Sequence, residues 1–334
     1  MTIKDLAQKT GYGVATVSRV LNDHPNVSET ARSVILRAAE ECGFQLNTNA
    51  KQLKQQRSNA ILVVVKGRSN EMFSELLEYI QSLADQANCP LHVDYMEESF
   101  NEVQRAVKLN RELKPLGILF LGGDGKNFLA DFHHIDIPCV LVTSDASKLG
   151  FSNLSSVCTD DRAASRAAMD SLLDMGHRSF AIVGGCKDTS DTSRLRFEGC
   201  IDALSSRGLG FEEELSYKGV LFSCENGYKA TLELLEQNKD FTALFAVADV
   251  MAIGAIRALR DSGLKVPEDV SVMGFDGLPL GSYLVPQLST VNQSTKEMAR
   301  LSVELLLSQI NEGAHTRHIY VPFELQHRES TRYI

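Results

Sequence analysis

Six short apolar runs constrain the fold of this chain more than any other feature of its sequence. They are continuous rather than alternating and rich in Val, Ile and Leu, as are strands buried on both faces of a parallel sheet. They occupy residues 60–65, 117–121, 139–143, 180–184, 243–247 and 270–275. Segments with helical spacing lie between them, at residues 71–87, 161–175, 194–207 and 252–259. This alternation predicts a doubly wound α/β architecture, and six or more units over about 270 residues favour two subdomains.

The ends of these strands predict where a ligand binds. In open α/β sheets, ligands bind beyond the carboxyl ends of the strands. The residues that follow the predicted strands are Lys66–Arg68, Gly122–Asp124, Thr143–Asp145, Cys186–Arg196, Ala248–Asp249 and Asp276. These residues are the first candidates for a ligand site.

A separate all-helical head is predicted over residues 1–44. Thr2 and Asp5 form a capping-box pattern, so a helix is expected from about residue 3. Gly11 ends that helix, and a second short helix is expected over 14–21. A third helix is expected from an N-cap at Ser28 to about residue 41. Two short helices joined by a glycine turn and followed by a supporting helix are typical of a helix-turn-helix.

The second helix has two distinct faces. Val14, Val17 and Leu21 are spaced to face inward, which leaves Thr16, Ser18 and Arg19 pointing outward. The spacing fits DNA binding, and it fits equally well a three-helix head that has no role in DNA binding.

Charge is distributed unevenly along the chain. Residues 1–57 contain eight Lys and Arg and five Asp and Glu, which gives a charge of +3. The whole chain has a net charge of -9, so the residues after 57 carry -12. A basic head on an acidic body favours nucleic-acid binding by the head alone.

The composition predicts a protein of the cytoplasm with no membrane partner. Residues 1–10 are polar and lack the apolar segment of a signal peptide, and the apolar runs are too short to cross a bilayer. The seven cysteines are scattered and form no C-x-x-C pair, which argues against a disulfide framework or a zinc site.

Seven segments of the sequence closely resemble the LacI family of bacterial transcription regulators. They are VATVSRVLN (14–22), VSETARSVILRAAEECGF (27–44), GHRSFAIVGG (176–185), SRLRFEGCIDAL (193–204), ADVMAIGAIRAL (248–259), VPEDVSVMGFD (266–276) and PQLSTVNQ (286–293). The resemblance implies a DNA-binding regulator, expected to be a repressor, that acts as a homodimer on double-stranded operator DNA. It implies a helix-turn-helix head followed by two periplasmic binding protein-like subdomains.

The resemblance also implies the domain boundaries. The head spans 1–44, a hinge helix or linker 45–58, and an effector-binding and dimerisation domain 59–334. Within that domain, an N-subdomain takes about 59–159 and 292–320, and a C-subdomain takes about 160–291 and 321–334.

The same resemblance implies which residues of the head contact DNA. Val14, Ala15 and Arg19 face base edges in the major groove, where an arginine contacts guanine through two hydrogen bonds. Thr2, Thr16, Ser18 and Asn22 are also candidates, with the last three mostly holding phosphates. Gly13 departs from the family, which usually has Ser or Thr capping the second helix.

The linker matches the family's hinge helix at Asn49, Ala50 and Leu53. Short isolated helices are marginal in water, so the segment is expected to order only with a partner helix and DNA. Leu53 then acts as an apolar wedge between base steps in the minor groove. Leu46 stands where the family usually has proline.

In the body, the resemblance implies a cleft that binds a small-molecule effector, either a sugar, a sugar derivative or a nucleoside-like compound. The matching residues are Phe73, Thr143, Arg196, Phe222, Ala248, Asp249 and Asp276. Ala248 stands where many sugar-binding members have Asn, and Thr143 where some have Asp. With the added positive charges of Lys66 and Arg68, these departures favour a ligand that carries an anionic group.

Other chemistries are weakly supported. Gly122, Gly123 and Gly125 lack the last glycine of a dinucleotide loop, and His133–His134 has no further ligands at metal spacing. No motif marks a nucleophile, so neither a catalytic residue, a metal nor a cofactor is predicted. Two alternatives remain, namely a regulator signalled mainly by a protein partner and a solute-binding protein. The head and the missing signal peptide argue against the second.

Overall fold

The computed structural model describes residues 3–21, 27–42, 58–67, 70–237 and 240–334. The chain forms two compact units, Met1–Gln56 and Arg57–Ile334. We call them the head and the body.

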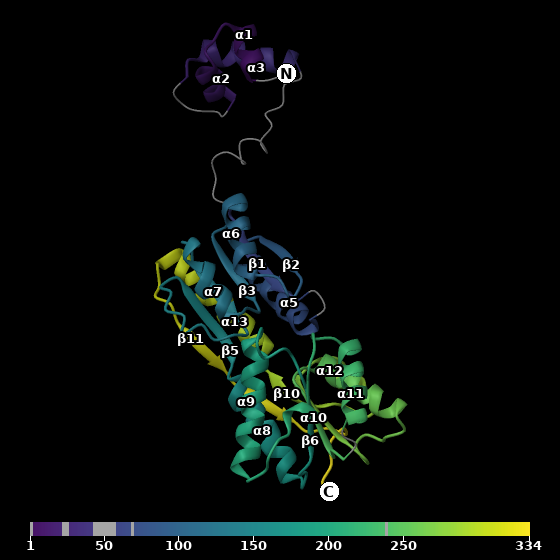
Figure 1. Ribbon diagram of the computed structural model, residues 1–334. Helices are drawn as coiled ribbons and strands as arrows, with labels where there is room; N and C mark the ends of the chain where they lie inside the picture. The colour runs from purple at the N-terminus through teal and green to yellow at the C-terminus, as the bar shows by residue number, and fades with distance from the viewer. Residues whose placement is uncertain (1–2, 22–26, 43–57, 68–69, 238–239) are drawn as a thin grey trace. The chain divides into compact units, whose positions relative to one another are not determined.

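The head contains three helices, α1 (Ile3–Thr10), α2 (Val14–Leu21) and α3 (Glu29–Glu41) (Figure 1). Gly11 follows α1 with a φ of 72°, a left-handed conformation that costs glycine little, and it makes the turn into α2. The Ser28 hydroxyl accepts the N–H of Ala31 at 3.4 Å and caps α3, as the sequence predicts. These features confirm the predicted helical head.

Small and branched side chains from all three helices form the core of the head: Leu6, Ala7, Val17, Val20, Ala31, Ile35 and Ala39. Val14 was expected to face inward, and this prediction was wrong, because its side chain is 44% exposed. Val14 is the first residue of α2, and Val17 and Val20, three residues apart, supply the buried face of that helix.

The body contains two six-stranded sheets, which confirms the predicted pair of α/β subdomains. Sheet 1 has the order β11-β5-β4-β3-β1-β2, and its pairings are all parallel. Its strands are β1 (Ile61–Lys66), β2 (Leu91–Met96), β3 (Gly117–Leu121), β4 (Cys139–Val142), β5 (Leu154–Thr159) and β11 (His318–Val321).

Sheet 2 has the order β12-β10-β9-β8-β6-β7 and is parallel except where β12 runs antiparallel to β10. Its strands are β6 (Phe180–Gly184), β7 (Tyr217–Gly219), β8 (Ala243–Ala246), β9 (Ser271–Asp276), β10 (Ser289–Gln293) and β12 (Phe323–Gln326). The chain passes between the two sheets three times, after β5, β10 and β11.

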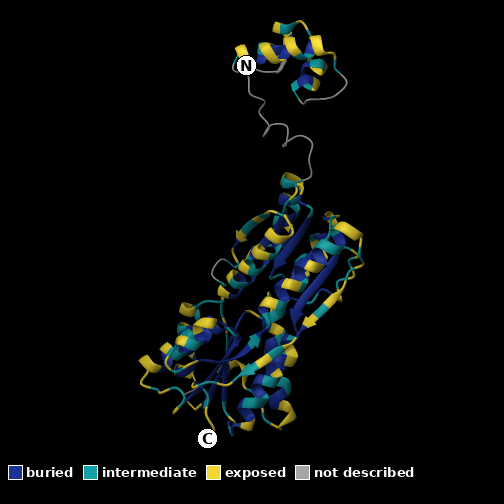
Figure 2. Ribbon diagram, turned by 180° about the vertical axis from the view of Figure 1, so that it is seen from behind, coloured by how far each residue is buried: buried dark blue, intermediate teal, exposed yellow. Residues whose placement is uncertain are grey.

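Helices connect most of the strands and cover the sheets (Figure 1). They are α5 (Glu71–Gln86), α6 (Glu102–Leu113), α7 (Gly125–Asp131), α8 (Asp161–Asp174), α9 (Asp191–Ser206), α10 (Glu213–Ser216), α11 (Cys224–Gln237), α12 (Asp249–Asp261) and α13 (Thr295–Glu312), with 3-10 turns η1 (Phe132–His134) and η2 (Pro279–Tyr283). The strands between them are largely buried, as the dark blue ribbons of Figure 2 show. Each of the six predicted apolar runs forms one of these strands.

Candidate functional site

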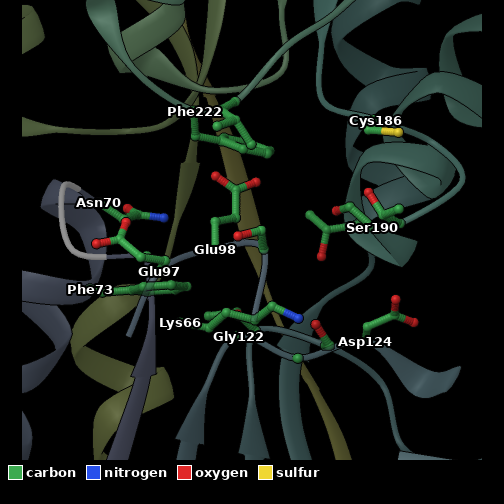
Figure 3. Close-up of a pocket in the computed structure, with 18 of the residues that line it drawn as sticks. Lys66, Asn70, Phe73, Glu97, Glu98, Gly122, Asp124, Cys186, Ser190 and Phe222 are labelled. Carbon is green, nitrogen blue, oxygen red and sulfur yellow. The ribbon is translucent and has the colours of Figure 1, made fainter. Parts of the chain in front are cut away.

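A cavity of about 620 Å³ lies between the strand ends of the two sheets (Figure 3). Sheet 1 contributes Lys66 at the end of β1, Gly122 after β3 and Thr143 after β4. Sheet 2 contributes Cys186 after β6 and Asp276 at the end of β9. The carboxyl ends of parallel strands from both subdomains thus meet at one site, which is where open α/β sheets bind ligands.

The cavity gathers most of the residues that the sequence singles out in the body. Its lining includes Phe73, Thr143, Arg196, Phe222 and Asp276.

Two other candidates, Ala248 and Asp249, are not among the lining residues, and both are buried. The Asp249 carboxylate accepts the Leu278 N–H at 2.7 Å and the Thr290 hydroxyl at 2.6 Å. These contacts explain the burial of Asp249 without a ligand.

Arg196 on α9 is the most constrained cation of the cavity wall. Its Nε donates to Asp161 at 2.7 Å, and its Nη1 donates to the Val247 carbonyl at 2.5 Å. Asp276 Oδ1 lies 3.5 Å from the same Nη1, and the guanidinium stacks 3.6 Å from the centroid of the Phe275 ring. These contacts fix the guanidinium plane at the cavity wall and leave other N–H groups of its five donors available.

Asp276 ends β9 with a φ of 127°, in the region that L-residues rarely adopt. The Gln293 side-chain amide donates to its Oδ1 at 2.8 Å. Burial raises the pKa of Asp276 to about 6, while Arg196 and Gln293 act in the opposite direction. The carboxyl group is therefore held by one amide and one guanidinium at the point where β9 reaches the cavity.

Two glycines make room for the aromatic rings of the cavity. A Cβ at Gly122 would lie 3.0 Å from Cζ of Phe73, and Gly122 has a φ of 79°. A Cβ at Gly185 would lie 2.8 Å from Cε2 of Phe222. Phe73 belongs to α5 and Phe222 follows β7, and Figure 3 shows the two rings on different sides of the cavity.

The loop after β2 supplies lining residues that the sequence did not indicate. Glu97, Glu98, Ser99 and Asn101 all line the cavity. Asn70, the N-cap of α5, also lines it, and its side chain accepts the Met72 N–H at 3.1 Å. The strand-end rule that found the other lining residues would have found this loop had β2 been recognised.

Lys66 is already paired. Its Nζ donates to Glu102 Oε2 at 2.6 Å, and the Glu102 side chain is fully buried. Glu102 also accepts the Asp124 N–H at 2.7 Å and the Asn127 amide at 2.9 Å. The expectation of an anionic ligand relied on the departures at Thr143 and Ala248 and on the positive charges of Lys66 and Arg68. Lys66 is neutralised within the wall, and Arg68 lies outside the described residues.

Glu98 faces Phe222 in the cavity. Its carboxylate points toward that residue in Figure 3. Burial raises the pKa of Glu98, while the Phe222 N–H and Lys66 lower it. Its ionised form is thus only partly compensated by its surroundings.

In the head, α2 presents the residues that the sequence assigns to DNA. Val14, Ala15 and Arg19 are exposed, and Thr16 and Ser18 are half-buried. Gly13 stands at the start of α2, where its carbonyl accepts the N–H groups of Thr16 and Val17. The other candidates, Thr2, Asn22, Asn49, Ala50 and Leu53, lie outside the described residues.

Among the described residues, no group of three or more His, Cys, Asp or Glu side chains is placed to hold a metal ion. No described helix has the length and apolar character needed to span a membrane. All seven cysteines are free.

Two family models match this chain. Residues 2–47 match "Bacterial regulatory proteins, lacI family", and residues 169–331 match "Periplasmic binding protein-like domain". Among curated relatives, the HTH-type transcriptional regulator MalR of Clostridium butyricum is 34% identical over 99% of both chains. Catabolite control protein A of Priestia megaterium is 29% identical, also over 99% of both chains.

Solved structures give the same result over the whole chain. The lac repressor dimer bound to operator and the anti-inducer ONPF matches with a TM-score of 0.73, at 25% identity and over 99% of both chains. A complex of the transcriptional regulator CelR with cellobiose matches with a TM-score of 0.71, at 27% identity and over 99% of both chains.

Proposed function

We propose that this chain, which belongs to the lacI family of bacterial regulatory proteins, binds operator DNA through α2 under the control of an effector in the cavity. Family membership makes the protein a DNA-binding transcription regulator, and such a regulator acts in the cytoplasm, where the chromosome lies. The observation that carries the effector role is the cavity itself, because both subdomains contribute strand ends to its lining. The cavity binds its ligand without transforming it.

The exposed face of α2 supports the DNA-binding role of the head. Arg19 is exposed on the helix while Val17 and Val20 anchor the opposite face. A helix held in this way enters a major groove with its polar face toward the base edges. Arg19 then contacts a guanine, and Thr16 and Ser18 contact phosphates.

We assign the hinge role to Asn49, Ala50 and Leu53 on their match to the family pattern. Leu53 inserts between base steps at the centre of the operator, and the resulting kink brings the two half-sites onto the two heads. Replacing Leu53 with Ala weakens operator binding in this scheme and leaves the body folded.

The effector is a small polyhydroxylated molecule. The lining is rich in hydroxyl and amide groups, which include Asn70, Asn127, Thr143, Ser190 and Asn226. Phe73 and Phe222 add apolar ring faces, which pack against the carbon faces of sugar rings. The names of relatives point the same way, since one solved relative is described in complex with cellobiose and another with ribose.

The protein acts as a homodimer. Tyr283 is 83% exposed and Val285 88% exposed, and Leu280 beside them is also exposed. Contiguous exposed apolar side chains of this size mark an interaction surface. A symmetric dimer buries the same patch on both copies and presents two heads to a near-palindromic operator. The solved lac repressor relative is described as a dimer bound to operator.

Effector binding controls DNA binding through the body. The three chain crossings after β5, β10 and β11 allow the two subdomains to change orientation about the cavity. A ligand that contacts both walls binds one orientation more tightly than another and shifts the population of the dimer that binds DNA.

A paired measurement tests this function. Operator sequences are first selected from random duplexes with the full-length protein. A panel of sugars, sugar derivatives and nucleosides is then screened by thermal shift, and each hit is added to the operator-binding assay. We expect at least one hit that changes operator affinity, and that change gives the sign of the coupling. Failure to select any DNA sequence would overturn the proposal.

A further inference from the structure

The positive groups of the cavity wall are compensated by partners behind that wall. Lys66 donates to Glu102 at 2.6 Å, and Glu102 is fully buried. Arg196 pairs with Asp161 at 2.7 Å and has Asp276 at 3.5 Å. A buried ion pair of this kind leaves little net positive field for an incoming anion.

The remaining charged lining residues of the described chain are acidic. Glu97, Glu98 and Asp124 carry three carboxylates, and Figure 3 places them at separate points around the cavity. Asp124 accepts the Lys126 N–H at 3.0 Å as the N-cap of α7, and Glu98 points toward Phe222 in Figure 3. An ionised carboxylate has about four acceptor sites, and the Lys126 N–H occupies one of those of Asp124.

Resting on the proposed effector role of the cavity, we propose that the effector is an amino sugar whose ammonium group binds the carboxylate of Glu98. An ammonium group has three N–H donors and a full positive charge, and charge-assisted hydrogen bonds are about twice as strong as neutral ones. The half-buried setting of Glu98 strengthens this pairing, because the local dielectric is lower than in water.

The neighbours of Glu98 suit the rest of such a ligand. Phe222, toward which Glu98 points, lines the cavity, and Phe73 lies on another side. Aromatic faces stabilise both the carbon face of a sugar and an adjacent cation. The volume of about 620 Å³ equals roughly 20 water molecules at about 30 Å³ each, which accommodates one or two sugar rings.

The test compares ligands that differ only in the substituent at C2 of each sugar ring. Glucosamine, N-acetylglucosamine and glucose form one series, and the β-1,4-linked dimers of the same three sugars form another. Binding to the full-length protein is measured by calorimetry near pH 6.5, below the pKa range of such amines. We expect the amine of at least one series to bind about tenfold more tightly than its hydroxyl and acetylated counterparts.

Variants assign that preference to one carboxylate. Glu98→Gln keeps the size of the side chain but removes the charge, so we expect it to abolish the preference for the amine. Glu236→Gln removes an equal charge from an exposed position of α11 outside the lining and retains the preference.

Two outcomes overturn the inference. The first is equal or weaker binding of both amines relative to glucose and cellobiose in the wild-type protein, which includes the case in which neither amine binds. The second is an unchanged preference in Glu98→Gln. Neither outcome affects the proposed function, because operator selection and the response to the wider metabolite panel are measured separately.

Discussion

Arg196 and Asp161 form an ion pair of 2.7 Å in which both side chains are about 95% buried. The pair joins α9 to the start of α8 and holds the guanidinium beside Asp276. The negative charges of Asp161 and Asp276 are therefore both compensated by the Arg196 guanidinium, and all three side chains are buried.

Replacing Arg196 with Ala removes that cation, and we expect the free energy of unfolding of the body to fall by about 3–5 kcal/mol. Denaturant titration measures this change. Arg194→Ala is the matched control, since Arg194 lies on the same helix and pairs with Asp191 and Glu198 on the surface. Exposed pairs contribute about 0–1 kcal/mol, so similar losses in the two variants would contradict the buried role of Arg196.

Arg19→Ala tests the recognition role of α2. We expect specific operator binding to weaken by about 1–3 kcal/mol and discrimination to relax at one base position, because the arginine contact to a guanine edge is lost. Binding to the selected operator and to single-base variants of it measures both effects.

Arg37→Ala serves as the control for Arg19→Ala, because it removes the same charge from α3, at an exposed position of the head. It should weaken binding to all sequences alike, since a charge lost from the head reduces only the sequence-independent attraction to phosphates. A uniform loss in Arg19→Ala as well would place Arg19 on a phosphate rather than on a base.

Val285→Asp tests the dimer surface. A charge at Val285, the most exposed of the three apolar side chains, costs free energy when two copies meet, so we expect the variant to sediment as a monomer at micromolar concentration. Operator affinity falls with it, because each head then binds one half-site alone. Leu129→Asp, at a side chain 61% exposed on α7, is the control outside the patch. A dimer that survives Val285→Asp and not Leu129→Asp would place the interface near α7 instead.

The sequence predicted the strands that are continuously apolar, and it missed those that carry polar side chains. Among the missed strands is β5, which reads LSSVCT and is fully buried. β2 reads LHVDYM and lies at the edge of sheet 1 with most side chains partly exposed, so it has no apolar run. Because β2 went unrecognised, Glu97 and Glu98 were absent from the candidate residues. The ion pair of Lys66 with Glu102 also escaped prediction, since 36 residues separate the partners and only the packing of α6 beside β1 joins them.

The head shows the same limit on a smaller scale. The helices were predicted almost to the residue, because capping and glycine signals are local. The prediction that Val14 is buried was wrong, because periodicity gives the direction of a side chain but not where the core ends. Whether a residue near the end of a helix contacts a ligand or DNA depends on where the core ends.

A last prediction concerns pH and the carboxyl group of Asp249. Burial and the nearby Asp276 raise its pKa to about 8, against the hydrogen bonds from Thr290 and Leu278. In the unfolded chain the pKa is about 3.9. The folded state therefore binds a proton that the unfolded chain has already released between these values. The resulting stabilisation is complete below about pH 4 and is lost as pH rises through about 8.

Asp249→Asn removes this dependence, because an amide resembles the protonated carboxyl group and does not titrate. Its oxygen accepts the Leu278 N–H, and its NH2 donates to Thr290 after the hydroxyl rotates. Denaturant titrations from pH 5 to 8 should show the unfolding free energy of the wild type falling relative to that of the variant. Asp261→Asn is the control of opposite sign, since pairing with Arg257 lowers the pKa of Asp261 and its contribution is lost only as pH falls. A pH-independent difference between wild type and Asp249→Asn would show that Asp249 is already ionised at pH 5, with Thr290 and Leu278 outweighing burial.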